Sequence, residues 1–457
     1  MSLLERRTKA DWQELDNDHY MHPFTDHKDL GEKKSRIIAK AKGVYIYDVD
    51  DNEILDAMSG LWCVNAGYGR SELADAAAEQ LRELPYYNSF FQCANPPSIE
   101  LAQMLKEVTQ PHLNRVFYTG SGSESIDTMI RIVRRYWEVM GEPERKTIIA
   151  RKNAYHGSTI AGVSLGGMNP MHSQGGPLLP GIEHIDQPYW FDSDRSLPPA
   201  EFGIKMAGQL EEKILQLGAE NVAAFVGEPI QGAGGVIIPP DTYWPEIERI
   251  CKHYGILLVN DEVICGFGRL GEWFGADHFQ IKPDLITFAK GVTSGYLPLG
   301  GVMVGDRVAD TLIEKGGEFN HGFTYSGHPA SCAVAIKNIQ ILKDENLIER
   351  VKNEIGPYMQ EKWHSLAEHP IVGETRMVGL MGAMELVANK SSSVRYDNKS
   401  TAGTVYRDFA VNNGLVMRAV GDTIVTSPPL IISNSEVDEL IDKAWKCLDH
   451  TYKTMTS

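Results

Sequence analysis

The chain has 457 residues, 42% of them hydrophobic and 23% charged, so it can bury a large core and is not a disordered protein. Its formal net charge of −17, without a basic stripe, excludes a nucleic-acid groove. The charged first 20 residues offer no signal peptide, no stretch reaches membrane-spanning length, and the six cysteines lack zinc or disulfide spacing; together these features favour the cytoplasm.

The first predicted element is a β-hairpin in the run GVYIYDVDDNEILDAM, with its turn at Asp50 to Asn52. From about residue 100, six short β-branched or aromatic runs alternate with helical stretches, which predicts a mostly parallel sheet covered by helices. One helix is expected directly after GSGSE. Its apolar residues recur at helical spacing: Ile126, Met129, Ile130, Val133, Tyr136, Trp137 and Met140.

Beyond residue 330 the pattern changes to helix, short strands and a last amphipathic helix from Ser435, where Ser435 and Asp438 can form a capping box. We therefore predict an α/β protein in three parts. Residues 61–330 form a large domain, residues 331–457 form a smaller α/β domain, and residues 1–60 pack with the smaller domain.

Lys290 follows the apolar run LITFA, at the carboxyl end of a predicted parallel strand, where open α/β sheets place their ligands. Burial there would lower the lysine pKa and favour a Schiff-base nucleophile. The alternative from the residues alone is a lysine at a helix start that reaches to solvent.

Asp261 and Glu262 end the preceding strand run, ILLVNDE, and point to opposite faces, so only one of them can face a given site. A carboxylate at this position could cap a helix, bind a metal or hold a protonated heterocyclic nitrogen. Asp261 lies 29 positions before Lys290, a spacing that suits one strand-helix-strand unit.

Two further segments follow strand runs. Ser121, Gly122 and Ser123 lie between a strand and a helix, where backbone N–H groups and hydroxyls can hold a phosphate. Tyr155 and His156, in NAYHGST, are either packing residues or part of a site. An amine, a carboxylate, a phosphate turn and an aromatic ring are together what pyridoxal 5′-phosphate requires.

The resemblance to a known family is carried by LLVNDEVICGFGRLGEWFG, KPDLITFAKGVTSGYLPLGG, TGSGSE, YHGST, EPIQGAGG and HGFTYSGHP. Across nearly the whole chain these motifs resemble the class III aminotransferases, or ω-transaminases, of pyridoxal-phosphate fold type I. The similarity is greatest to the amine:pyruvate branch, which includes putrescine, polyamine and β-alanine:pyruvate aminotransferases. It implies an amine donor, pyruvate as acceptor, and a ping-pong reaction through pyridoxamine phosphate that yields alanine.

The resemblance also implies roles for single residues. Lys290 would bind the cofactor covalently and move the substrate proton, and Asp261 would pair with the pyridine nitrogen. The cofactor ring would lie between Tyr155 and Val263. Other roles implied are phosphate binding by Gly122 and Ser123 with Thr324 of a partner subunit, and support of Asp261 by Glu228 and His156. The protein is accordingly expected to be a homodimer with shared sites, possibly pairing into a tetramer.

For the substrates, the resemblance places Arg418 at the pocket mouth, where a guanidinium suits the carboxylate of the keto acid. Residues matching the donor pocket are Phe24, Leu61, Trp62, Phe90 and Ala233. Their apolar character favours the methylene chain of a diamine such as putrescine. β-Alanine and 4-aminobutyrate remain alternative donors, and an aminomutase, a decarboxylase or a non-enzymatic cofactor-binding protein remain alternative functions.

The chain departs from the common family pattern at three positions. Ile126 and Asn260 stand where the family commonly has Asn and Ala, and Gly227 stands where Ala is frequent. An isoleucine beside the phosphate turn predicts weaker retention of the cofactor.

Overall fold

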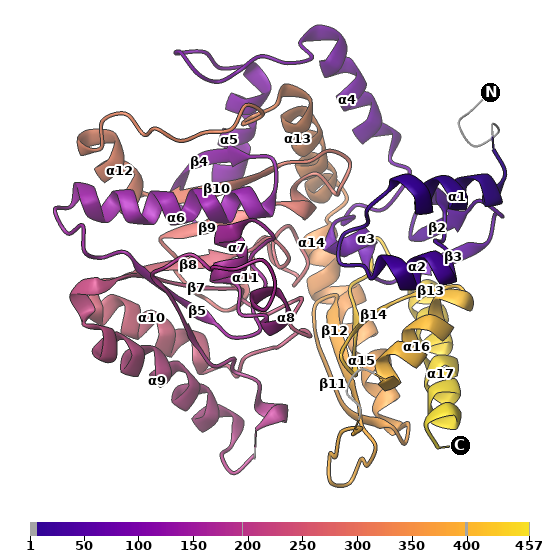
Figure 1. Cartoon of the computed structure of the whole chain (residues 1–457). Coiled ribbons are helices and arrows are strands. Elements are labelled where there is room, and N and C mark those ends of the chain that lie inside the picture. Colours follow the sequence, from indigo (N-terminus) through magenta and orange to yellow (C-terminus); the bar gives the residue numbers. More distant parts are fainter. Residues whose placement is uncertain (1–6, 194, 398–400, 457) are drawn as a thin grey trace.

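A seven-stranded sheet organises the computed structural model, which describes residues 7–193, 195–397 and 401–456 (Figure 1). The strand order is β4-β10-β9-β8-β7-β5-β6, and β10 alone runs antiparallel to its neighbours. The α/β fold with a mostly parallel sheet is confirmed. The strands are β4 Leu113–Thr119, β5 Thr147–Arg151, β6 Ile182–Ile185, β7 Val222–Gly227, β8 Leu257–Asp261, β9 Leu285–Phe288 and β10 Gly300–Gly305.

Helices cover both faces of this sheet because its strands are apolar on both sides (Figure 1). One face carries α6 (Gly122–Val139) and α12 (Asp306–Lys315), and the other carries α9 (Pro199–Leu217) and α10 (Tyr243–Tyr254). The predicted apolar stripe of α6 is buried except Met140, which follows the last turn and is 43% exposed. Within the described ranges no helix is long and apolar enough to cross a membrane. The remaining helices of this region are α4 Ser71–Glu83, α5 Pro96–Val108, α7 Ile160–Leu165, α8 Asn169–His172, α11 Gly275–His278 and α13 Pro329–Asp344.

A second sheet joins the two ends of the chain. Its order is β1-β2-β3-β13, and β2 and β3 form the predicted hairpin, with the Asp48 carboxylate accepting the N–H groups of Asp50 and Asn52. β13 comes from the C-terminal part and pairs parallel with β3. The domain boundaries at residues 60 and 330 stay predictions. The elements are α1 Lys9–His19, α2 His27–Lys33, β1 Ile38–Lys42, β2 Tyr45–Asp48, β3 Glu53–Asp56 and β13 Leu415–Val416.

The C-terminal part contains a third sheet in the order β11-β12-β15-β14. The last helix, α17, begins at Asn434 rather than Ser435, and the expected Ser435–Asp438 capping box is wrong. Ser433 and Glu436 form it instead: Ser433 Oγ accepts the Glu436 N–H, and Glu436 Oε2 accepts the Ser433 N–H at 2.7 Å. The elements are α14 Leu347–Arg350, α15 Gly356–Ser365, β11 Val372–Val378, β12 Met381–Leu386, α16 Thr401–Asn412, β14 Arg418–Val420, β15 Thr423–Thr426 and α17 Asn434–Thr456.

Candidate active site

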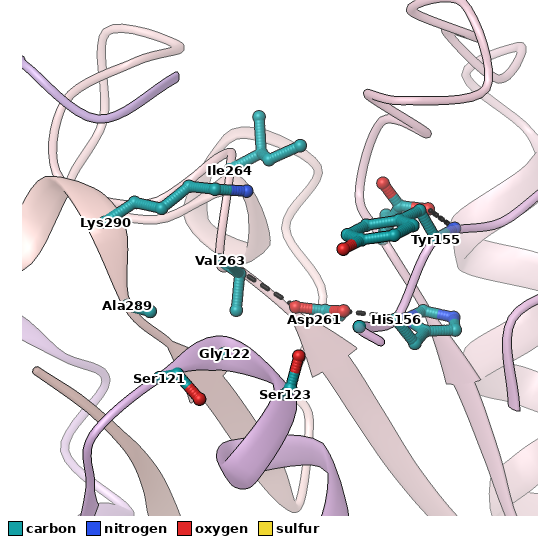
Figure 2. A pocket seen from close by; sticks show the side chains of 12 residues that line it. Ser121, Gly122, Ser123, Tyr155, His156, Asp261, Val263, Ile264, Ala289 and Lys290 are labelled. Atoms are coloured by element: carbon teal, nitrogen blue, oxygen red, sulfur yellow. Dashed lines mark hydrogen bonds and ion pairs between the residues drawn. The ribbon is translucent and has the colours of Figure 1, made fainter. Parts of the chain in front are cut away.

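A cleft of about 540 Å³, partly open to solvent, lies at the edge of the large sheet where β4, β5, β7, β8 and β9 all end. Nine residues predicted from the sequence line it. They are Ser121, Gly122, Ser123, Tyr155, His156, Glu228, Asp261, Val263 and Lys290, joined by Gly157, Ile264 and Ala289, which the sequence did not indicate (Figure 2).

Asp261, the last residue of β8, lies at the floor of the cleft and is held by three groups. Its Oδ2 lies 2.6 Å from His156 Nδ1, and its Oδ1 accepts the Val263 N–H at 3.2 Å (Figure 2). Oδ1 also accepts the Thr287 hydroxyl at 3.0 Å. Thr287 lies opposite Asp261 in the parallel pairing of β8 with β9. Only that register could have revealed Thr287, and sequence analysis missed it.

Glu262 faces away from the cleft, as the alternation of strand side chains predicts. It is completely buried and accepts the N–H groups of Gly275 and Ala276 at 2.8 and 2.7 Å, at the start of α11. Burial raises its pKa to about 8. Of the two adjacent carboxyls, Glu262 anchors a helix and Asp261 alone faces the cleft.

Glu228 follows β7 and binds two backbone segments. Its Oε1 accepts the Tyr155 N–H at 3.2 Å, and its Oε2 accepts the Gly232 N–H at 2.8 Å. Burial raises the pKa of this carboxyl, and the nearby His156 opposes the shift. Glu228 therefore fixes the backbone of the Tyr155 loop beside Asp261.

The amino end of α6 forms another wall of the cleft. Ser121 caps the helix by accepting the Glu124 N–H, and Glu124 accepts the Gly120 N–H at 2.6 Å. Gly122 lets the helix begin close to β8, since a Cβ there would lie 3.0 Å from Val263. The hydroxyls of Ser121 and Ser123 and the positive helix end suit an anion.

Lys290 extends into the cleft from the opposite side (Figure 2). Burial lowers its pKa, while neighbouring Cys63, Asp261 and Glu228 oppose that shift. Within the described part of the chain, its amine makes no hydrogen bond or ion pair. Its backbone has φ of 48°, a left-handed conformation that is uncommon for a lysine and clusters at functional sites. The reading of Lys290 as a lysine directed to solvent is therefore not supported.

The residues predicted for the substrate pocket lie outside this cleft lining. Phe24 is 77% exposed and contacts Tyr155 edge to face at 6.4 Å between ring centroids. Trp62, at the end of α3 (Ser59–Trp62), is buried in an apolar cluster that includes Ile264. Leu61 and Phe90 are exposed, Ala233 is buried in the turn after Glu228, and Thr324 is exposed, with its carbonyl accepting the Tyr86 hydroxyl.

Arg418, at the start of β14, is partly buried. Burial lowers its pKa, and the nearby Tyr155 opposes the shift. It makes no hydrogen bond or ion pair with any other described residue. This arginine is consequently available to an anionic ligand.

The three departures from the family pattern have different environments. Ile126 is 1% exposed and packs in the core under α6, away from the phosphate turn, so weaker cofactor retention stays an untested prediction. Asn260 is completely buried, and its amide has no partner among the described residues. Gly227 leaves room for Arg151, which donates to the Glu228 carbonyl: a Cβ at Gly227 would lie 3.2 Å from Arg151 Nη2.

These groups fit pyridoxal 5′-phosphate. The cleft presents an amine without a partner among the described residues, a carboxylate anchored by three contacts, and a helix start with two hydroxyls, Ser121 and Ser123, each of which accepts one backbone N–H and keeps its own O–H to donate. His156 Nε2 is buried and has no partner within the described ranges, which is a second unfilled polar position in the same wall. Lys290 would bind the aldehyde carbon, and Asp261 would pair with the pyridine nitrogen. Ser121 and Ser123 would hold the phosphate.

Comparison with known proteins agrees with this chemistry. Residues 29–448 match the family model of class III aminotransferases. The chain is 58% identical, over 98% of its length and 98% of the relative's, to putrescine–pyruvate aminotransferase of Pseudomonas aeruginosa. It is 42% identical, over 94% of its length and 83% of the relative's, to the chloroplastic gamma aminobutyrate transaminase 3 of Solanum lycopersicum.

Solved structures of ω-transaminases share this fold. An (S)-enantioselective ω-transaminase from Thermomicrobium roseum superposes with a TM-score of 0.94 at 42% identity, covering 97% of this chain and 99% of that one. The ω-transaminase of Pseudomonas jessenii, solved in complex with PMP, gives 0.94 at 37% identity, with 96% and 98% covered. The chain belongs to the class III aminotransferases and is a pyridoxal-phosphate-dependent aminotransferase.

Proposed function

We propose that this enzyme moves the amino group of a primary amine, with a diamine such as putrescine favoured, to pyruvate, releasing an aldehyde or ketone and L-alanine. The observation that carries the proposal is the 58% identity, along nearly the whole chain, to a putrescine–pyruvate aminotransferase. A cytoplasmic location is part of the proposal, and the cysteine pattern supports it.

The residues of the cleft have distinct tasks in this reaction. When bound, pyridoxal phosphate supplies an electron sink and carries the amino group from one substrate to the other. Asp261, kept in place by His156, Val263 and Thr287, holds a proton on the pyridine nitrogen. Lys290, whose lowered pKa favours the neutral amine, would take the proton from the substrate Cα and deliver it to the aldehyde-derived carbon of the cofactor, C4′.

Arg418 is the proposed group for the acceptor. Its guanidinium, which bonds to no other residue that the structure describes, can bind the carboxylate of pyruvate through two parallel hydrogen bonds. An amine donor has no carboxylate for it, so we propose that Arg418 moves toward the keto acid and away from the amine. Phe24, Leu61, Trp62, Phe90 and Ala233 remain the proposed donor-side residues.

The proposed assembly is a homodimer with shared sites. An exposed aromatic patch supports it: Tyr86, Tyr87, Phe90, Phe91 and Tyr325 are each between 37% and 91% exposed. The Tyr86 hydroxyl donates to the Thr324 carbonyl, and the Tyr86 and Tyr325 rings lie 5.7 Å apart. The patch thus adjoins Thr324, the residue proposed to reach the partner's phosphate site.

A donor panel tests the function. Putrescine, cadaverine, β-alanine, 4-aminobutyrate and an arylalkylamine are each supplied with pyruvate, and alanine formation is measured. Putrescine is expected to give the highest kcat/KM. Preference for 4-aminobutyrate would instead support the second candidate, an ω-amino acid transaminase, which the 42% identical tomato enzyme favours. Cofactor binding without alanine from any donor would contradict both.

A further inference from the structure

An arginine outside the cleft, Arg376 on β11, is bonded at every N–H of its guanidinium. Its Nε donates to the Val236 carbonyl at 2.7 Å, and Nη2 donates to the Gly235 carbonyl at 2.6 Å and to Glu385 at 2.7 Å. Nη1 donates to the Tyr189 hydroxyl at 2.9 Å and to Glu374. The side chain is 8% exposed, so these bonds form away from solvent.

Two of the five bonds hold a strained turn, residues 232–236. Val236 is completely buried and has φ of 54°, a conformation that its branched side chain disfavours strongly. Inside the turn, the N–H groups of Gly235 and Val236 both bond to the Gly232 carbonyl at 3.0 Å. Such strain persists only where surrounding contacts impose it, and Arg376 supplies two contacts to this backbone.

The other end of the turn is bonded to Glu228, which lines the cleft. The Gly232 N–H donates to Glu228 Oε2, and Glu228 in turn holds the Tyr155 backbone. Ala233, a proposed donor-side residue, lies between Gly232 and the residues that Arg376 binds. A continuous set of bonds therefore runs from Arg376 through the turn to the loop that carries Tyr155 and His156.

The far side of Arg376 is fixed by the C-terminal sheet. Glu385 on β12 is completely buried, accepts from Arg376 and Arg395, and accepts the Thr423 hydroxyl at 2.9 Å. These neighbours hold the pKa of Glu385 at about 2, so it remains anionic, although burial acts in the opposite direction. The C-terminal sheet thereby presents a rigid cation to the turn.

We propose that Arg376 is a positioning residue for the amino-transfer reaction: it imposes the strained turn 232–236, and through it the place of Glu228 and of the Ala233 wall against the amine donor. Only a planar guanidinium can hold both carbonyls and Glu385 together, because a lysine is a point charge with three donors. The effect on the amine donor rests on the proposed function, whereas the effect on the turn rests on the geometry alone.

The test compares Arg376→Lys with the matched control Arg395→Lys, which also loses a guanidinium bonded to Glu385 but does not touch the turn. Hydrogen–deuterium exchange of the peptide covering residues 229–238 is measured on both apoproteins, after far-UV circular dichroism has shown native secondary structure. Arg376→Lys is expected to speed exchange at least tenfold, and Arg395→Lys less than twofold. Equal effects of the two variants, or unchanged exchange in folded Arg376→Lys, would overturn the proposal.

Steady-state kinetics then separate positioning from general damage. In Arg376→Lys the KM of the amine donor should rise about tenfold while the pyruvate KM changes less than threefold, because Arg418 is not attached to the turn. Parallel rises in both KM values would overturn the positioning role. If the wild-type enzyme accepts no amine, the proposed function fails while the exchange result still decides the structural claim.

A second variant covers the case in which Arg376→Lys does not fold. Glu385→Gln keeps the side-chain shape and weakens the anchoring of Arg376 from the side opposite the turn. Glu385→Gln should raise the rate of hydrogen–deuterium exchange of the same peptide about threefold, less than Arg376→Lys does. Arg395→Lys is again the control. Exchange equal to wild type in folded Glu385→Gln would overturn the proposal.

Discussion

At the scale of single residues, Lys290 gives a prediction about pH. Burial lowers the pKa of Lys290 in the folded chain below the ordinary 10.5. At any pH between the folded-state pKa and 10.5, the unfolded chain therefore holds a proton that the folded chain has released. The free energy of unfolding that Lys290 contributes to the apoprotein must therefore rise with pH across this window. Lys290→Met should be relatively more stable at the lower pH, and its advantage should shrink as pH rises toward 10.5.

Urea unfolding of the two apoproteins at a series of pH values measures this difference. Lys290→Met is also expected to lose alanine formation completely. A difference in stability that stays constant with pH would show that Lys290 keeps its ordinary pKa in the folded protein. Tyr155→Phe serves as the control, since it alters the same cleft but leaves the amine in place.

Arg418 gives a prediction about substrate choice. Replacing it by alanine removes the only proposed partner of the pyruvate carboxylate, and a charge-assisted bidentate pair is worth roughly 1.5–3 kcal/mol. The pyruvate KM of Arg418→Ala should rise by at least about tenfold, since 1.4 kcal/mol corresponds to that factor. The amine KM should change little. Equal rises in both values would contradict the assignment.

At the scale of elements, the sequence predicted which strands end at the site but not how they pair. Two of the apolar runs are followed or ended by a residue with chemistry, so Asp261 and Lys290 could be found by reading strand ends, whereas Glu228 was implied only by the family resemblance. Thr287 lies inside β9, and only the register opposite Asp261 gives it a function. The antiparallel direction of β10 was equally hidden, because a buried antiparallel strand has the same apolar pattern as a parallel one.

The start of α17 shows why helix boundaries are difficult to read. The segment SNSEVD offers two overlapping capping boxes, Ser433 with Glu436 and Ser435 with Asp438, and composition does not choose between them. In the structure the first pair caps the helix. Asp438 instead accepts a hydrogen bond from the Tyr358 hydroxyl at 2.8 Å, so packing against α15 decides the register.

This difference gives a matched prediction. Ser433→Ala should lower the free energy of unfolding by about 1 kcal/mol, because the Glu436 N–H loses its acceptor. Ser435→Ala removes an identical hydroxyl two residues later and should cost less than about 0.5 kcal/mol. Urea unfolding of both variants decides it. A larger loss for Ser435→Ala would restore the capping box expected from the sequence.

At the scale of the whole molecule, residues whose position depends on distant segments were beyond reading from the sequence. Trp62 is an example: it is buried in a cluster with Ile264, a residue of the cleft lining that lies about 200 positions later in the chain, and its donor-side role stays a prediction. Arg376 is another example, because two of its partners, Val236 and Tyr189, lie 140 and 187 positions earlier in the chain. Tertiary contacts of this kind are set by topology rather than by neighbouring residues.

The shared site of the proposed dimer gives the last prediction. If each site takes Lys290 from one subunit and Thr324 from its partner, Lys290→Ala and Thr324→Glu each inactivate every site of their own homodimers. The first removes the amine, and the second places a carboxylate against the cofactor phosphate, a like-charge contact. A mixed dimer of the two variants, however, has one doubly defective site and one site built entirely from wild-type residues.

Coexpression with two different affinity tags isolates that mixed dimer. Its alanine formation should return to about half of the wild-type rate per dimer, with one pyridoxal phosphate bound, while both parent homodimers stay inactive. The control pairs Lys290→Ala with Asp261→Ala, two defects that lie in the cleft of the same chain and leave neither site intact. If the mixed dimer with Thr324→Glu is inactive, Thr324 does not contribute to the partner's site. An intact site can form in this dimer only if Thr324 acts across the interface.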